Sequence, residues 1–223
     1  VITAGINRIV GMRPDSTVCI IDDDEAIRES LRLLLYAEGL GSICYASADA
    51  FLDSEEPASF ECLLLDIRMP GTDGLELFRI LKQRQLAQPV IFITGHGDIP
   101  LAVSAIKQGA YEFMTKPFRE GELLEKVNSA ISHFRSVKQE LRELEELQAR
   151  ADSCTPRERD VMTLLASGLP NKGIAETLGI SPRTVEIHRA HVMDKMGADS
   201  LPALVRMVAL LENGSPRSDR TSD

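Results

Sequence analysis

The stretch CLLLDIRMPG, residues 62–71, decides the fold of this chain. Its apolar half, Cys62 to Leu65, is short and apolar enough to be a strand that is buried on both faces of a sheet. Asp66 ends that run, and an unpaired carboxylate is too costly to bury deep in a core. We therefore place Asp66 at the carboxyl end of a parallel sheet, where open α/β folds bind their ligands.

Three further apolar runs end in polar side chains. Residues 18–21 lead into Asp22, Asp23 and Asp24, residues 90–93 into Thr94, and residues 111–115 into Lys116. Carboxylate oxygens are the usual protein ligands of Mg²⁺, and a lysine ammonium neutralises phosphoryl charge. A helix N-cap explains one of the three adjacent acids, but three neighbouring carboxylates repel one another, and a bound cation relieves that repulsion. The strand ends therefore predict a magnesium and phosphoryl site.

Four motifs, IIDDDE (20–25), LLLDIRMPG (63–71), FITGHGD (92–98) and FMTKPF (113–118), resemble the successive motifs of the response-regulator receiver domain. The resemblance covers residues 17–134 and implies a flavodoxin-like, doubly wound parallel sheet with strand order 2-1-3-4-5. It also implies a role for each matching residue: Asp66 as phosphoryl acceptor, Asp22, Asp23, Asp66 and the backbone carbonyl of Arg68 as Mg²⁺ ligands, Thr94 and Lys116 as phosphoryl contacts, and Phe113 as a switch aromatic. Taken alone, Phe113 is equally a plain core aromatic.

Composition indicates a two-domain globular protein. The chain has 223 residues and a net charge of −9, and no apolar stretch approaches the roughly 20 residues that a membrane span needs. Four cysteines show no metal-ligand spacing, and no export signal is visible, so we expect a reduced cytoplasmic compartment and no membrane association. The net charge lies in residues 1–154, with 25 acidic and 16 basic side chains, and that part is a poor candidate for nucleic-acid binding.

Short apolar runs alternate with amphipathic helical patterns in the first part of the chain, as in βαβ units. Beyond Glu120 a single helix is expected to run to about residue 151, and its later part is either a solvated spacer or a short coiled coil. The expected organisation is an N-terminal tail (1–16), a receiver domain (17–134), a helical linker (135–152), an all-α four-helix domain (153–212) and a disordered tail (213–223).

The second domain begins with Thr155-Pro156-Arg157-Glu158, a capping box with proline at the first helical position. We expect Asn171 to cap a second helix, and Gly179-Ile180-Ser181 to form the turn of a helix-turn-helix. Residues 153–210 resemble the four-helix output domain of the LuxR/FixJ type, which implies DNA binding. The weaker alternative is a small helical interaction domain.

The third helix of this domain is the predicted recognition helix. Val185, His188, Val192 and Met196 form its inner stripe, where His188 is more readily a packing residue than a ligand. The candidate base and phosphate contacts are Lys172, Arg183, Thr184, Glu186, Ile187, Arg189, Ala190 and Lys195.

Together these patterns predict a phosphorylation-activated transcriptional regulator, not an enzyme beyond its own phosphorylation and dephosphorylation. Its expected partners are a sensor histidine kinase, promoter DNA, RNA polymerase and, on phosphorylation, a second copy of the chain, which the family resemblance implies binds through the face of residues 98–119. One rival is a phosphatase that forms an aspartyl-phosphate, but Arg68 stands where such an enzyme needs a second aspartate. The other rival is a DNA-binding protein that does not depend on phosphorylation.

Overall fold

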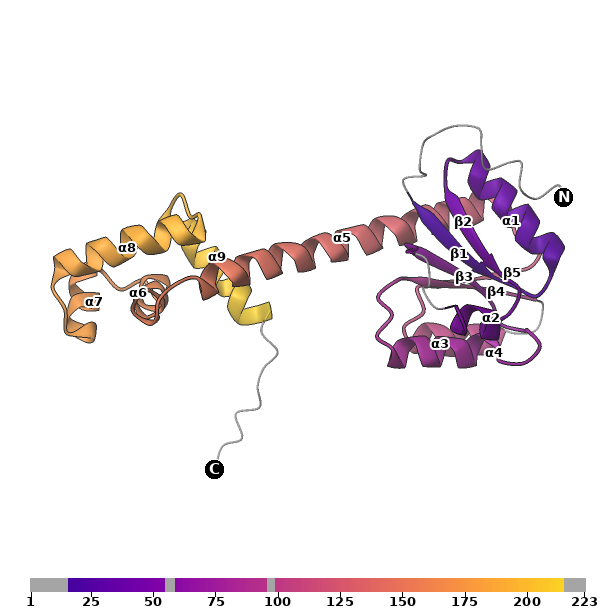
Figure 1. The fold of residues 1–223 in the computed structure, drawn as a ribbon, viewed down its shortest axis with the longest axis horizontal. Coiled ribbons are helices and arrows are strands. Elements are labelled where there is room, and N and C mark those ends of the chain that lie inside the picture. Colours follow the sequence, from indigo (N-terminus) through magenta and orange to yellow (C-terminus); the bar gives the residue numbers. More distant parts are fainter. Residues whose placement is uncertain (1–15, 55–58, 96–98, 215–223) are drawn as a thin grey trace, which may run out of the picture. The chain divides into compact units, whose positions relative to one another are not determined.

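The computed structural model describes residues 16–54, 59–95 and 99–214. The chain forms two units that divide between Val137 and Lys138 (Figure 1). Both predicted tails, apart from Ser16 and residues 213–214, lie outside the described residues. So does Asp98, which the sequence predicts as the N-cap of a helix because Pro100 follows in the first turn.

The first unit contains a five-stranded parallel sheet with the order β2-β1-β3-β4-β5. The strands are β1 (Thr17–Ile21), β2 (Gly41–Tyr45), β3 (Cys62–Asp66), β4 (Val90–Thr94) and β5 (Glu112–Thr115). This is the predicted doubly wound fold, and β1, β3 and β4 lie at the centre of the sheet. β3 and β4 are buried along their whole length, as their continuous apolar runs predict.

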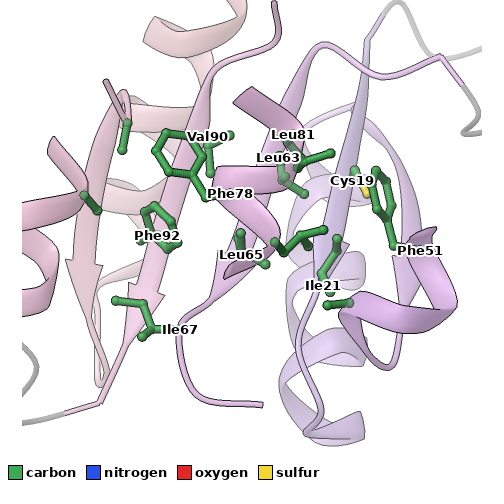
Figure 2. Close-up of a cluster of buried hydrophobic side chains, with 14 of the residues drawn as sticks. Cys19, Ile21, Phe51, Leu63, Leu65, Ile67, Phe78, Leu81, Val90 and Phe92 are labelled. Atoms are coloured by element: carbon green, nitrogen blue, oxygen red, sulfur yellow. The ribbon is translucent and has the colours of Figure 1, made fainter. Parts of the chain in front are cut away.

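Helices cover both faces of this sheet. They are α1 (Glu25–Ala37), α2 (Ala48–Leu52), α3 (Gly74–Gln83), α4 (Ile99–Lys107) and the first part of α5 (Glu120–Asp152). Because side chains alternate along a strand, odd and even residues of β3 enter different cores. Leu63 and Leu65 pack with Phe51 of α2 and Phe78 of α3 (Figure 2), whereas Leu64 packs with side chains of α1 and α5.

Helix α5 contributes to the cores of both units. Leu123 and Val127 pack against the sheet of the first unit, while Leu147 and Ala151 are buried with the helices of the second. The last turns of the predicted linker therefore belong to the core of the second unit, and only the stretch around Leu141, which is 54% exposed, fits a solvated spacer. Among the described helices, none has the length and apolarity that crossing a membrane demands.

The second unit is all-helical, with α6 (Pro156–Ala166), α7 (Asn171–Leu178), α8 (Pro182–Met196) and α9 (Leu201–Gly214) around one apolar core. The capping box at Thr155 is present, and Ser181 caps α8 by accepting from the Thr184 N–H at 3.1 Å. The prediction for Asn171 is wrong: it is the first residue of α7, the N-cap is Pro170, and no side chain caps this helix. Asn171 Oδ1 instead accepts from Arg189 Nη1 at 3.3 Å.

Candidate phosphorylation site and DNA-binding surface

The predicted site residues of the first unit meet at the carboxyl edge of the sheet. β1 and β3 are neighbours, with Ile21 opposite Leu65, so Asp22 and Asp66 leave adjacent strands at the same level. β4 lies on the other side of β3, with Ile93 opposite Asp66. Parallel strands bring these residues together although they are far apart in sequence.

Lys116 joins the two buried carboxylates. Its Nζ donates to Asp22 Oδ2 at 2.7 Å and to Asp66 Oδ2 at 3.1 Å. The side chains of Asp22 and Asp66 are only 2% and 9% exposed, and that of Lys116 is 21% exposed. The sequence predicted that Lys116 would contact the phosphoryl group, but it contained no signal for the ion pair with Asp22.

This arrangement shifts the pKa of Asp66 and that of Lys116. Burial raises the pKa of Asp66 above its ordinary value, the positive charge of Lys116 opposes that rise, and the negative charge of Asp22 adds to it. For Lys116, burial works to lower the pKa, but hydrogen bonds and charge from Asp22 and Asp66 outweigh it, and the pKa is raised. Lys116 is therefore held as a cation, while ionised Asp66 is disfavoured unless positive charge is near.

Three carboxylates are placed to bind a cation. Oxygens of Asp22, Asp23 and Asp66 all lie within 4.8 Å of one another, and Asp23 is exposed while the other two are buried. Asp24 is not part of this cluster, because it caps α1 by accepting from the Ala26 N–H at 2.8 Å. An all-oxygen donor set that is open to solvent on one side suits Mg²⁺, which keeps several of its waters.

The backbone on both sides of this cluster is tied in place. Asp22 Oδ1 accepts from the Asp24 N–H at 2.9 Å, and Arg28 Nη1 donates to the Asp22 carbonyl at 2.7 Å. The Arg68 N–H donates to the Asp66 carboxylate, while the Arg68 side chain is exposed. The Arg68 carbonyl remains a predicted Mg²⁺ ligand.

Gly74 allows α3 to begin directly against Asp66. A Cβ atom on Gly74 would lie 2.1 Å from the Asp66 carbonyl oxygen and 3.0 Å from the Ile67 Cα. The glycine is therefore required by a close approach of two backbones. Sequence reasoning did not single it out, because a close approach leaves no local signature beyond the glycine itself.

Thr94 at the end of β4 and Phe113 in β5 lie in different environments. Thr94 is fully buried at the end of β4, and its carbonyl accepts from the Lys116 N–H at 2.7 Å. Phe113 lies opposite Phe92 in the β4–β5 pair and packs, half-buried, against the core that contains Phe92. Their roles in the predicted switch remain predictions.

Helix α8 has the two faces that the sequence predicts for a recognition helix. Val185, Val192 and Met196 are fully buried. On the other face, the Arg183 and Glu186 side chains are 87% and 58% exposed and lie 4.0 Å apart. Ile187 is 50% exposed. Of the other predicted contacts, Lys172 and Ala190 are exposed, and Thr184 and Arg189 are half-buried.

The side chain of Lys195, another predicted DNA contact, is bound inside the second unit. Its Nζ donates to Glu158 Oε2 at 2.6 Å and to the Ser153 carbonyl at 3.0 Å. The Lys195 hydrogen bond, followed by that of the Thr155 N–H, lowers the pKa of Glu158 to about 2. Sequence reasoning identified Glu158 only as a capping-box residue and missed this ion pair between α6 and α8.

Comparison with known proteins matches one family to each of the two units. Residues 18–128 match the response regulator receiver domain, and residues 152–208 match the bacterial regulatory proteins of the luxR family. The transcriptional regulatory protein FixJ of Azorhizobium caulinodans is 48% identical over 92% of this chain and 96% of its own length. FixJ of Bradyrhizobium diazoefficiens is 46% identical over 85% of this chain and 93% of its own. The solved structure of the response regulator StyR, at 40% identity, has a TM-score of 0.79 and covers 86% of this chain and 98% of that one.

The chain therefore belongs to the response regulators, in the group of transcriptional regulators that joins a receiver domain to a LuxR-type DNA-binding domain.

Proposed function

We propose that Asp66 accepts a phosphoryl group from a sensor histidine kinase and that this event controls promoter binding by α7 and α8. The arrangement of Lys116 with Asp22 and Asp66 supports this most directly, since an invariably charged ammonium lies 3.1 Å from the proposed acceptor oxygen. In the transfer, the Asp66 carboxylate attacks phosphorus in line, a P–O bond forms, and the P–N bond of the kinase phosphohistidine breaks. Such transfers depend mainly on positioning and electrostatic stabilisation.

Asp22, Asp23 and Asp66 would hold Mg²⁺, together with the Arg68 carbonyl. Bound there, the ion would offset the repulsion between the carboxylates and the incoming phosphoryl oxygens. Lys116, whose ammonium binds Asp22 as well as Asp66, would supply a second positive charge beside the phosphoryl oxygens. The donor set of three carboxylates within 4.8 Å supports the assignment.

The readout would run through Thr94 and Phe113 to the segment that ends the sheet. The Thr94 hydroxyl would bond to a phosphoryl oxygen, and the ring of Phe113 would turn further inwards, which converts a charge event at Asp66 into a change at α4 and β5. On α4 the large apolar side chains Leu101, Val103 and Ile106 are 39%, 44% and 37% exposed. An exposed apolar surface of this kind supports dimerisation through residues 98–119.

The dimer would bind two half-sites of a promoter and act there with RNA polymerase in the cytoplasm. The second domain contains only seven basic side chains in residues 155–212, balanced by seven acidic ones, so one copy should bind DNA weakly. Glu186, Ile187 and Arg183 would face the major groove, where Glu186 and Ile187 would contact base edges, and Lys172 would contact phosphates.

Beryllofluoride with Mg²⁺, which mimics the phosphoryl group on Asp66, tests this proposal. We expect it to convert the chain to a dimer, measured by light scattering, and to tighten binding to a promoter fragment. Asp66→Asn should abolish both effects, whereas Asp53→Asn, a change at an exposed carboxylate at the end of α2, should abolish neither. An equal response of the Asp66→Asn protein would overturn the proposal.

A further inference from the structure

Three side chains with metal-ligand chemistry meet in the second unit, whereas the carboxylate cluster of Asp22, Asp23 and Asp66 belongs to the first. Glu158 lies in the first turn of α6, and His188 and His191 lie three residues apart on α8, a spacing that puts them on one face of the helix. One ligand atom from each lies within 4.8 Å of the other two. We propose that Glu158, His188 and His191 bind a transition-metal dication of the Zn²⁺ class and so cross-link α6 to the recognition helix.

The separation of Glu158 and His191 fits a metal better than a hydrogen bond. His191 Nδ1 lies 3.4 Å from Glu158 Oε1, which is long for a charge-assisted hydrogen bond of about 2.7–2.9 Å. Two ligand atoms at the roughly 2.0–2.2 Å bond lengths of tetrahedral zinc lie about 3.4 Å apart. The existing spacing of these two side chains is thus the edge of a tetrahedral site.

The second observation concerns His188. Its Nδ1 is a buried nitrogen without a hydrogen-bond partner among the described residues. Buried polar atoms nearly always have a partner, so this histidine, which clusters with Glu158 and His191, has one ring nitrogen that no hydrogen bond occupies among the described residues. The inner-stripe position explains why His188 is half-buried, but packing alone does not explain the unpaired nitrogen.

Lys195 binds one carboxylate oxygen of Glu158 and leaves the other oxygen available for a metal. The ammonium of Lys195 and the Thr155 N–H both donate to Oε2, at 2.6 and 2.8 Å, whereas Oε1 faces His191. A metal ion on Oε1 would weaken the attraction between Glu158 and Lys195. The Lys195 side chain is 33% exposed and keeps the Ser153 carbonyl as an acceptor, so it can move away from the metal without losing all of its partners.

The donor set decides the class of metal. Two imidazoles and one carboxylate suit Zn²⁺, Co²⁺, Ni²⁺ or Cu²⁺, whereas Mg²⁺ prefers oxygen ligands. Since the imidazoles must be unprotonated to bind, metal affinity should fall as the pH is lowered. The Glu158 site and the carboxylate cluster at Asp66 would therefore select different ions.

Cobalt binding to the full chain tests the proposal, with the protein free of any histidine tag and with excess Mg²⁺ to occupy the carboxylate cluster at Asp66. We expect one equivalent of Co²⁺ with the visible absorption of a four-coordinate site, and a Zn²⁺-dependent rise in the unfolding midpoint. His191→Asn should lose both. His191 is exposed, with 58% of its side chain accessible, so this variant should fold normally, as circular dichroism will verify.

His133→Asn is the matched control, because His133 is an exposed histidine of α5 in the first unit. The His133→Asn protein should still bind one equivalent of Co²⁺ with the same visible absorption, and Zn²⁺ should still raise its unfolding midpoint. The proposal is overturned if the unsubstituted chain binds no cobalt under these conditions, or if His191→Asn binds it with the same stoichiometry and spectrum as the unsubstituted chain.

Discussion

Lys116 Nζ lies 3.1 Å from Asp66 Oδ2 and is held there by a shorter bond to Asp22. The ammonium thus binds the proposed acceptor, Asp66, and Asp22 at the same time. If Asp66 is phosphorylated as proposed, Asp22 can retain Lys116 at the site. The pair with Asp22, which the sequence did not predict, would then keep a positive charge beside the proposed phosphoryl group.

We expect Lys116→Met to lower phosphorylation while it strengthens Mg²⁺ binding. Without the ammonium, Asp22 and Asp66 face each other without a counter-charge, so a dication gains affinity, but the phosphoryl oxygens lose a stabilising contact. In the presence of a chelator the fold should lose about 1.5–3 kcal/mol, the value of a hydrogen bond to a charged group. Calorimetric Mg²⁺ titration, phosphate-affinity electrophoresis and urea unfolding measure the three effects.

Lys126→Met is the control, because Lys126 forms an ion pair with Glu112 at 3.0 Å on the surface of the first unit. It should leave Mg²⁺ binding and phosphorylation unchanged and cost at most about 1 kcal/mol. Weaker Mg²⁺ binding in the Lys116→Met protein would contradict the electrostatic account.

Asp66→Asn should stabilise the metal-free protein at neutral pH. The folded-state pKa of Asp66 is raised, chiefly by burial, so the folded state holds the Asp66 proton more tightly than the unfolded state does. The stability that this proton contributes is present at low pH and lost as the pH rises through the folded pKa. At neutral pH the ionised carboxylate therefore costs stability, and the amide removes that cost.

Thermal unfolding with a chelator checks this expectation across pH. The difference between Asp66→Asn and the unsubstituted chain should shrink as the pH falls, and added Mg²⁺ should stabilise the unsubstituted chain more than the variant. A variant that is less stable at neutral pH would show that the bond to Lys116 outweighs the cost of burial.

Gly74→Ala should destabilise the first unit by several kcal/mol and reduce phosphorylation. The added Cβ would meet backbone atoms of Asp66 and Ile67, which cannot move aside as a flexible side chain would, and overpacking of this kind costs about 1–3 kcal/mol or more. Gly121→Ala is the matched control, since a Cβ at Gly121 in α5 meets nothing within 4 Å. That change should be neutral or stabilise by up to about 1 kcal/mol, and urea unfolding separates the two.

The sequence predicted the fold well wherever a local pattern has one structural meaning. The apolar run that ends at Asp66 predicts a buried strand, and the capping box at Thr155 marks a helix start. The prediction that Asn171 caps α7 failed because Pro170 provides the extended backbone of the N-cap without any side-chain hydrogen bond. Contacts such as Lys116 with Asp22, or Glu158 with Lys195, join residues 94 and 37 positions apart, and no local pattern encodes such distant partners.

In the second unit we expect Lys172→Ala, on α7, and Ile187→Ala, on α8, to have different effects. Lys172 is an exposed cation at the start of α7, so its loss should weaken binding evenly across sequences and reduce the salt dependence, with a change of about 1 in the slope. Ile187 has no charge and is half-exposed, so its loss should change sequence preference and leave the salt slope unchanged. Binding titrations on several fragments at a series of salt concentrations distinguish them, and a changed slope for Ile187→Ala would count against direct base contact.

Glu158 should make the second unit sensitive to acid over a defined range. Its pKa falls from 4.5 to about 2, first through the hydrogen bond from Lys195 and then through the Thr155 N–H; His191 also faces the carboxylate. Because the folded pKa is depressed, the stabilisation is complete above about 4.5 and is lost as the pH falls towards 2. We therefore expect Glu158→Gln to be clearly less stable than the unsubstituted chain above pH 4.5, and the difference to disappear near pH 2. Unfolding followed by circular dichroism measures that difference in stability, with a chelator present to remove any metal from the Glu158 site. A difference in stability that stayed constant over this pH range would show that Glu158 acts through its capping geometry and not through its charge.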